Sequence, residues 1–232
     1  GGLTSQIEDQ REENKALTLR LDQKRGELQT KKGRHASLEA LQQAALGQQD
    51  NIEVSWLERH GLGDKQRLAE QITVAQGWDI AAETVLGDHL QAVCVDGIDA
   101  LTSLLGDFQK GHLTFISASD SQPLGTQNSP LLLDKISGDS SLAGLLQGIR
   151  TAPDLASAMS MRASLGAAES VVTPDGIWLG RSWLRVNKDR DAESGVIKRQ
   201  EEMNLLVNQL EQLNDEVEAL TGKLDSGHIA LS

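Results

Sequence analysis

The chain has 232 residues, and its 22 lysines and arginines against 34 aspartates and glutamates give a formal charge of −12. This excess of acid disfavours a protein that coats nucleic acid over its whole surface. No stretch approaches the roughly 20 apolar residues of a membrane-spanning helix. The start, Gly1-Gly2, is followed by polar residues, which disfavours a signal peptide and indicates an excised fragment. The single Cys94 excludes a disulfide framework and favours a reduced, cytoplasmic setting.

The C-terminal segment carries an apolar heptad seam. Its members recur at alternating spacings of three and four: Met203, Leu206, Leu210, Leu213, Val217, Leu220 and Leu224. The positions between them are mostly Glu, Gln, Asn and Asp. The pattern therefore predicts a coiled-coil helix, since an ordinary surface helix buries a wider stripe.

The N-terminal segment carries a weaker seam, with polar residues at several of its positions. Its apolar members are Leu3, Ile7, Leu17, Leu21 and Leu28. After a polar gap around Gly33 the pattern predicts a change of phase, with the seam resuming at Leu38, Leu41, Ala45 and Ile52. Because the two segments flank one insert, they can pair only by folding back antiparallel, and Ile52 is expected to face Met203.

The middle of the chain alternates between helical and strand-like apolar spacings. The patterns predict helices over 81–86, 98–108, 142–146 and 154–161. They predict strands over 90–95, 113–116, 149–151 and 170–173, and a strand or hairpin over 177–186. The order helix, glycine, strand, turn, helix occurs in both halves, which indicates a degenerate internal repeat.

The expected fold class is α+β, with two similar mixed α/β subdomains that form a globular hinge flanked by an antiparallel α-helical coiled coil. The predicted segments are an arm over 1–54, subdomain one over 55–117, a linker over 118–135, subdomain two over 136–195 and an arm over 196–232.

No residue constellation typical of catalysis or metal binding is present in the sequence. It lacks the phosphate loop of nucleotide-binding proteins, and no two of its five histidines are spaced as a metal pair on a helix. Cys94 is predicted to be a core residue, and Asp96 and Asp99 to be a turn residue and a first-turn residue of a helix. No cofactor or metal is expected, and the fragment is not expected to hydrolyse ATP.

Two groups of residues are candidates for binding. Trp178 and Trp183 lie near Gly176 and Gly180, which permit close backbone approach, so both core and interface are open interpretations. A basic stretch overlaps them: Arg181, Arg185, Lys188, Arg190, Lys198 and Arg199. It is either a solvated run paired with Asp189, Asp191 and Glu193 or a phosphate-contacting patch, beside which Trp183 could stack on a base.

The pattern resembles the hinge of structural-maintenance-of-chromosomes (SMC) proteins. LAEQITVAQGWDIAAETVLGDHLQAVCV is similar to the first hinge subdomain of bacterial members, and SVVTPDGIWLGRSW to the strand and turn that close the second. The resemblance implies a homodimer in which each subdomain pairs with the other subdomain of the partner. It implies interface roles for Gly176 and Gly180, while the residues from Arg181 to Leu184 replace small residues of the family pattern.

The favoured function is the homodimerisation hinge of a chromosome condensation and segregation ATPase. Such a hinge joins two arms and contacts DNA weakly, without sequence preference, at the junction of hinge and arm. The full-length protein is expected to associate with the nucleoid and with accessory subunits. A stalked nucleic-acid-binding domain is the alternative, followed by an enzyme domain inserted in a coiled coil.

Overall fold

The computed structural model describes residues 2–122, 125, 127–128, 130–138, 140–188 and 195–231. The chain divides into two compact units. The first combines Gly1–Ala40 with Glu202–Ser232, and the second is Leu41–Glu201. The helices α1 (Gly2–Ala45) and α7 (Val196–Leu231) each belong partly to both units. Within the described ranges, no helix is both long and apolar enough to cross a membrane.

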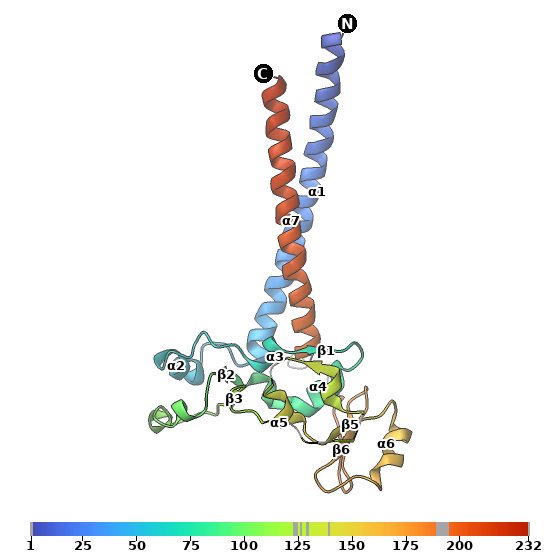
Figure 1. Ribbon diagram of the computed structural model, residues 1–232. Coiled ribbons are helices and arrows are strands. Elements are labelled where there is room, and N and C mark those ends of the chain that lie inside the picture. Colours follow the sequence, from blue (N-terminus) through green and yellow to red (C-terminus); the bar gives the residue numbers. More distant parts are fainter. Residues whose placement is uncertain are drawn as a thin grey trace. The chain divides into compact units, whose positions relative to one another are not determined.

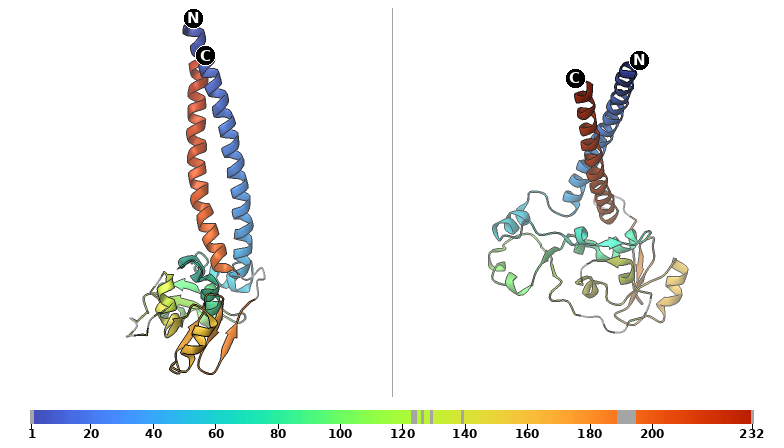
Figure 2. Two further views of the ribbon diagram at one scale, coloured as in Figure 1. Left: turned by 90° about the vertical axis from the view of Figure 1, so that its right-hand side faces the viewer. Right: turned by 45° about the horizontal axis from the view of Figure 1, so that its top comes forward.

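In the first unit, α1 and α7 run side by side and antiparallel, with both chain ends at the same end of the pair (Figures 1 and 2). All seven apolar residues of the α7 seam are buried or half-buried. The contact continues beyond them to Gly227, which is buried against Asn14 of α1. A polar Asn in such a seam costs stability and specifies register.

The predicted phase change in α1 is wrong. Buried and half-buried positions recur at spacings of three and four from Gln10 to Ala45 without interruption. Lys31 and His35 occupy two of these seam positions, and because both are polar, a search for apolar residues finds a gap there. Lys31 Nζ donates to Gln209 Oε1 of α7 at 3.0 Å. Gly33 lies on the exposed face of the helix and does not interrupt it.

Cross-helix contacts fix the register of the arms. Lys24 Nζ lies 3.0 Å from Glu216 Oε2, and Arg34 Nε lies 2.9 Å from Glu202 Oε1. Following both seams from Asn14 and Gly227 places Leu38 opposite Met203. The predicted pairing of Ile52 with Met203 is wrong by two heptads, because Ile52 begins a separate helix, α2 (Ile52–Arg59).

Cysteines introduced at Leu38 and Met203 should therefore form a disulfide within one chain at low protein concentration. A Cys94→Ser background removes the native thiol, and non-reducing electrophoresis measures the product. Ala36 and Met203 form the matched control pair, since Ala36 is exposed on the same helix and should give no intramolecular product. Crosslinks only between chains for the first pair would contradict the folded-back arms.

The second unit contains two copies of one α/β motif. The first copy comprises α3 (Leu68–Gln71), β1 (Thr73–Val74), α4 (Asp79–Leu86), η1 (Gly87–Gln91), β2 (Val93–Val95) and β3 (Phe115–Ser117). The second copy comprises η4 (Leu132–Lys135), β4 (Ile136–Ser137), α5 (Leu142–Leu146), β5 (Ile149–Thr151), α6 (Leu155–Arg162) and β6 (Ser170–Val172). In both copies the last two strands pair in parallel. A hairpin, β7 (Ile177–Leu179) and β8 (Leu184–Val186), extends only the second sheet, in the order β5-β6-β7-β8.

Matching hydrogen bonds show that the motif repeats in detail. The backbone N–H of Arg67 donates to Glu70 Oε2 at 2.7 Å, and the backbone N–H of Leu131 donates to Asp134 Oδ2 at 3.2 Å. Each carboxylate caps the short helix that opens its copy. The predicted repeat is present, but it begins earlier in each half than the sequence pattern indicated, and its closing helix forms only in the second copy.

One apolar core joins the two copies, because β1 and β4 pair antiparallel and bring α3 and η4 together. Leu68 and Leu132 occupy equivalent places in the copies, and both are fully buried in this core. Leu46, which directly follows α1, and Ile197 from the start of α7 are buried in the same cluster. A fragment cut at 55 and 195 would lose both side chains from its core.

One predicted helix of the second unit does not form. The predicted helix over 98–108 is wrong: the chain forms two 3-10 turns, Asp99–Leu101 and Leu105–Asp107. Gly106 weakens a continuous helix there, and Trp56 Nε1 holds the Asp107 carboxylate with a 2.8 Å hydrogen bond. Of the two alternatives over 177–186, the hairpin is confirmed: the chain turns between β7 and β8, where the Gly180 N–H donates to the Trp183 carbonyl.

Candidate dimer interface and basic stretch

In the two sheets that contain parallel strands, the outer edges of β3 and β8 carry no neighbouring strand within the described residues. The opposite edges of the two sheets are covered by isolated bridges, Arg67 with Val93 and Leu131 with Arg150. In the second copy, antiparallel β7 fills the place beside β6, and β6 is the equivalent of β3. No described strand takes that place beside β3 in the first copy. An open strand edge presents N–H and C=O groups that can pair with another strand.

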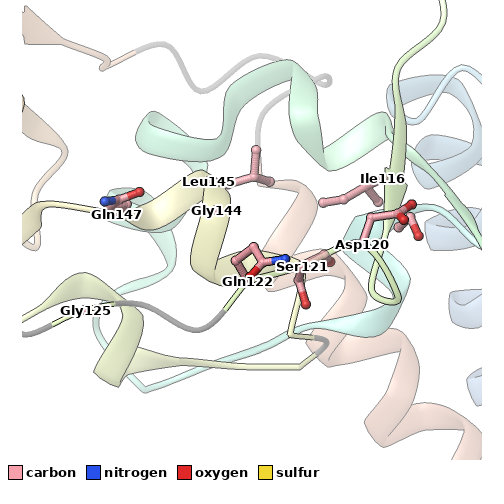
Figure 3. Close-up of a pocket in the computed structure, with 10 residues that line it drawn as sticks. Ile116, Asp120, Ser121, Gln122, Gly125, Gly144, Leu145 and Gln147 are labelled. Carbon is pink, nitrogen blue, oxygen red and sulfur yellow. The ribbon is translucent and has the colours of Figure 1, made fainter. Parts of the chain in front are cut away.

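A hollow of about 370 Å³ is lined partly by β3 (Figure 3). Ile116 and Ser117 of β3 contribute to its wall, and Gly144 and Leu145 of α5 line it from the second copy. Asp120, which follows β3, also lines the hollow, and its Oδ2 accepts a hydrogen bond from the Ile98 N–H at 3.0 Å. The described residues therefore leave space next to β3.

β8 is exposed along its whole length. Arg185 lies directly across from Trp178, while Leu184 and Val186 lie across from Leu179 and Ile177 and are 52% and 50% exposed. Antiparallel pairs alternate between bonded and non-bonded, and the Gly180 N–H bonds the Trp183 carbonyl. The N–H and C=O groups of Leu184 and Val186 therefore point away from β7, towards the open edge.

The two tryptophans form a single aromatic pair. Their ring centroids are 5.1 Å apart with an interplanar angle of 88°, and the Arg185 guanidinium lies 5.3 Å from the Trp178 ring centroid. Trp178 is half-buried against the core and donates from Nε1 to Ser170 Oγ at 2.9 Å. Trp183 is 44% exposed. Trp178 thus packs against both the core and Trp183. Trp183 presents apolar surface to solvent beside β8.

Both candidate glycines are required by packing within the chain. Gly176 has φ +86°, and a Cβ there would lie 2.7 Å from Ile80 Cγ2 and 3.0 Å from Thr84 Oγ1 of α4. A Cβ on Gly180 would overlap the indole of Trp183. Bulky substitutions at these glycines would disturb α4 or Trp183 directly, so they are poor tests of an interface.

The six basic residues have different surroundings. Arg181, Arg185, Lys188 and Lys198 are exposed. Arg199 donates from Nε to Gln42 Oε1 at 2.8 Å, and burial lowers the pKa of its guanidinium. Arg190 lies outside the described residues, as do Asp189, Asp191 and Glu193, the acids suggested as partners of this stretch.

Sequence reasoning missed one carboxylate, Glu83 of α4. Its two oxygens accept hydrogen bonds from the backbone N–H groups of Ile197, at 2.8 Å, and Gly195, at 3.1 Å. The sequence gives only a weak signal for this contact. Gly195 directly precedes α7 and has no side chain that could cap the helix, so a cap from elsewhere in the chain is needed. Across the described part of the chain, no three His, Cys, Asp or Glu side chains gather as metal ligands would.

Two α/β subdomains between antiparallel helical arms define a hinge domain. The chain belongs to the SMC hinge family: the family described as SMC proteins Flexible Hinge Domain matches residues 61–162. Its relatives include the chromosome partition protein Smc of Methylococcus capsulatus, which is 34% identical over 231 residues, 99% of this chain and 20% of that protein. The Smc protein of Coxiella burnetii is 36% identical over 189 residues, 80% of this chain and 16% of that protein. The chain thus spans a fifth or less of these relatives' length.

Solved structures support the same fold. The crystal structure of an asymmetric dimer of the Geobacillus stearothermophilus SMC hinge domain has a TM-score of 0.69 at 19% identity, covering 97% of this chain and 99% of that one. The Pyrococcus furiosus Smc hinge domain with an extended coiled coil has a TM-score of 0.50 at 21% identity, covering 99% and 88%.

Proposed function

We propose that this chain is the homodimerisation hinge of a bacterial chromosome segregation protein, and that two copies join through β8 of one and β3 of the other. The two open strand edges, one in each subdomain, carry this proposal. β8 would add antiparallel to β3 in the place that β7 takes beside β6. A two-fold axis repeats the contact and closes the assembly. In the longer protein, acting on the nucleoid, the arms would connect this hinge to ATPase heads and their accessory subunits.

The charge distribution supports contact between unlike subdomains. Residues 47–122 contain twelve acidic and four basic residues, whereas residues 131–188 contain five acidic and six basic residues. The exposed Arg181 and Arg185 flank and occupy β8, so they would approach an acidic partner subdomain. Complementary charge steers association and suppresses other orientations.

The first test is the mass of the whole chain in solution. Light scattering at micromolar concentration should give twice the 25.0 kDa of one chain. Added salt should weaken the dimer, because it screens the attraction between the subdomains. A single-chain mass that persists at high micromolar concentration would contradict the proposal.

A second proposed function is weak DNA binding beside the start of α7. Lys188 and Lys198 are exposed in a chain that is otherwise acidic, whereas Arg181 and Arg185 would face the partner subdomain in the proposed dimer. Arg190 belongs to the same basic stretch of sequence, while Arg199 is engaged by Gln42. Trp183 would favour single strands if a base stacks on its exposed face.

Replacing Lys188 and Lys198 with Glu should abolish binding of short oligonucleotides in fluorescence anisotropy at low salt, while the dimer mass stays unchanged. For the unsubstituted protein, three or four phosphate contacts predict a log–log salt slope of about 0.9 per contact on duplex and about 0.7 on single strands. The control replaces Lys15 and Lys32, two exposed lysines of α1, with Glu and should retain binding. Equal loss in both variants would indicate only a general charge effect.

A further inference from the structure

The first turn of α7 is held by a side chain from another element. Glu83 on α4 accepts hydrogen bonds from Ile197 and Gly195 and so satisfies backbone donors that a helix start leaves unpaired. Its negative charge also lies at the positive end of the α7 dipole. The start of this helix is therefore fixed by subdomain one.

Burial disfavours the ionised form of Glu83. Burial raises the pKa of Glu83, although the Ile197 and Gly195 N–H groups oppose the rise. A raised folded-state pKa gives a stabilising contribution that is present at low pH and lost as the pH rises through that pKa. The two N–H contacts, and not this linkage, fix the position of the start of α7.

The end of α1 joins the same cluster. Gln42 is buried, and its Nε2 donates to the Val196 carbonyl at 2.9 Å and to Gln200 Oε1 at 3.1 Å. Its Oε1 accepts from Arg199 Nε. The end of α1 and the start of α7 are thus hydrogen-bonded to each other beside Glu83, within the second unit.

The other contacts of α4 lead to the sheet that ends in β8. Ile80 and Thr84 pack so closely on the turn between β6 and β7 that only glycine fits at position 176. Trp178 of β7 packs against the core cluster that contains Ala81 and Ile197. One short helix therefore touches both the hairpin with the open edge and the start of α7.

We propose that α4 mechanically couples the β7–β8 hairpin to the start of α7, and that Glu83 is the positioning residue through which this coupling acts. Its biological meaning rests on the proposed dimer: occupation of the β8 edge would shift the first turn of α7 within the second unit. Movement of the hairpin would displace α4, and α4 would carry the N–H partners of Glu83 with it.

Amide hydrogen exchange of the full chain, followed by mass spectrometry, tests the positioning role. Glu83→Ala should raise exchange in the first two turns of α7 by about tenfold, because local opening there loses two bonds. Glu83→Gln keeps one carbonyl oxygen and should show a smaller rise. Asp79→Asn, an equal charge change on the same helix, should show none. Residues 206–220 should be unaffected in all three variants, and an equal rise there would overturn the assignment.

A double-mutant cycle tests the coupling. Gly176→Ala pushes on Ile80 and Thr84 and should raise exchange at the start of α7. Gly148→Ala is the matched control, since it also has positive φ and a clash, at 2.8 Å from the Ala168 carbonyl oxygen, but it does not contact α4. In the Glu83→Ala background the added effect of Gly176→Ala should disappear.

If Gly176→Ala behaves like Gly148→Ala, or if its effect adds fully to that of Glu83→Ala, the coupling is refuted. Light scattering on the same samples separates this result from the proposed function. A monomeric wild type with intact coupling would refute the dimer alone, and a dimer without coupling would refute the role of α4 alone.

Discussion

Replacing Leu184 and Val186 together with Glu is expected to convert the dimer to folded monomers. The dissociation constant should rise by about 100-fold or more, because two charges would lie on the open edge of β8 and face an acidic partner subdomain. Both side chains are about half exposed in one chain, so their replacement removes little internal packing. Sedimentation velocity measures the mass, and tryptophan fluorescence reports whether the fold is intact.

The chain offers a closely matched control. Leu155 and Met159 on α6 are 42% and 44% exposed in the same subdomain, and Glu at both positions adds the same charge away from β8. That variant should remain a dimer. A dimeric Leu184→Glu/Val186→Glu protein would show that this edge is not the interface.

Leu68→Ala and Leu132→Ala are each expected to lower the free energy of unfolding by about 2–5 kcal/mol. Both leucines have no exposed surface and occupy equivalent positions in the two copies of the motif. Each truncation leaves a cavity in the single core that joins the copies, so the two costs should be similar. Urea unfolding followed by tryptophan fluorescence measures the unfolding free energy of the second unit, because all four tryptophans lie in that unit.

Leu105→Ala provides the control for this pair. Leu105 is 46% exposed in a 3-10 turn, and its truncation should change the unfolding free energy by no more than about 0.5 kcal/mol. A cost at Leu68 or Leu132 no larger than this would contradict the shared core.

Local periodicity was enough to predict the arms, the antiparallel pairing and a mixed α/β insert with an internal repeat. A heptad seam is a pattern of near neighbours, and two such seams around one insert leave a single way to pair. The phase error in α1 has the same origin. An apolar pattern cannot register Lys31 as a seam residue, because its place there depends on Gln209 on the other helix.

Only the tertiary structure decided which residues of the candidate site act together. It separated Arg199, bound to Gln42, from the exposed lysines, and it showed that Gly176 is required by α4. The sequence by itself determined the periodic elements, whose side chains repeat within a few residues. Contacts such as that between Glu83 and Ile197 join distant positions through a single pair of groups, so they leave no periodic trace and arise only when the core brings α4 and α7 together.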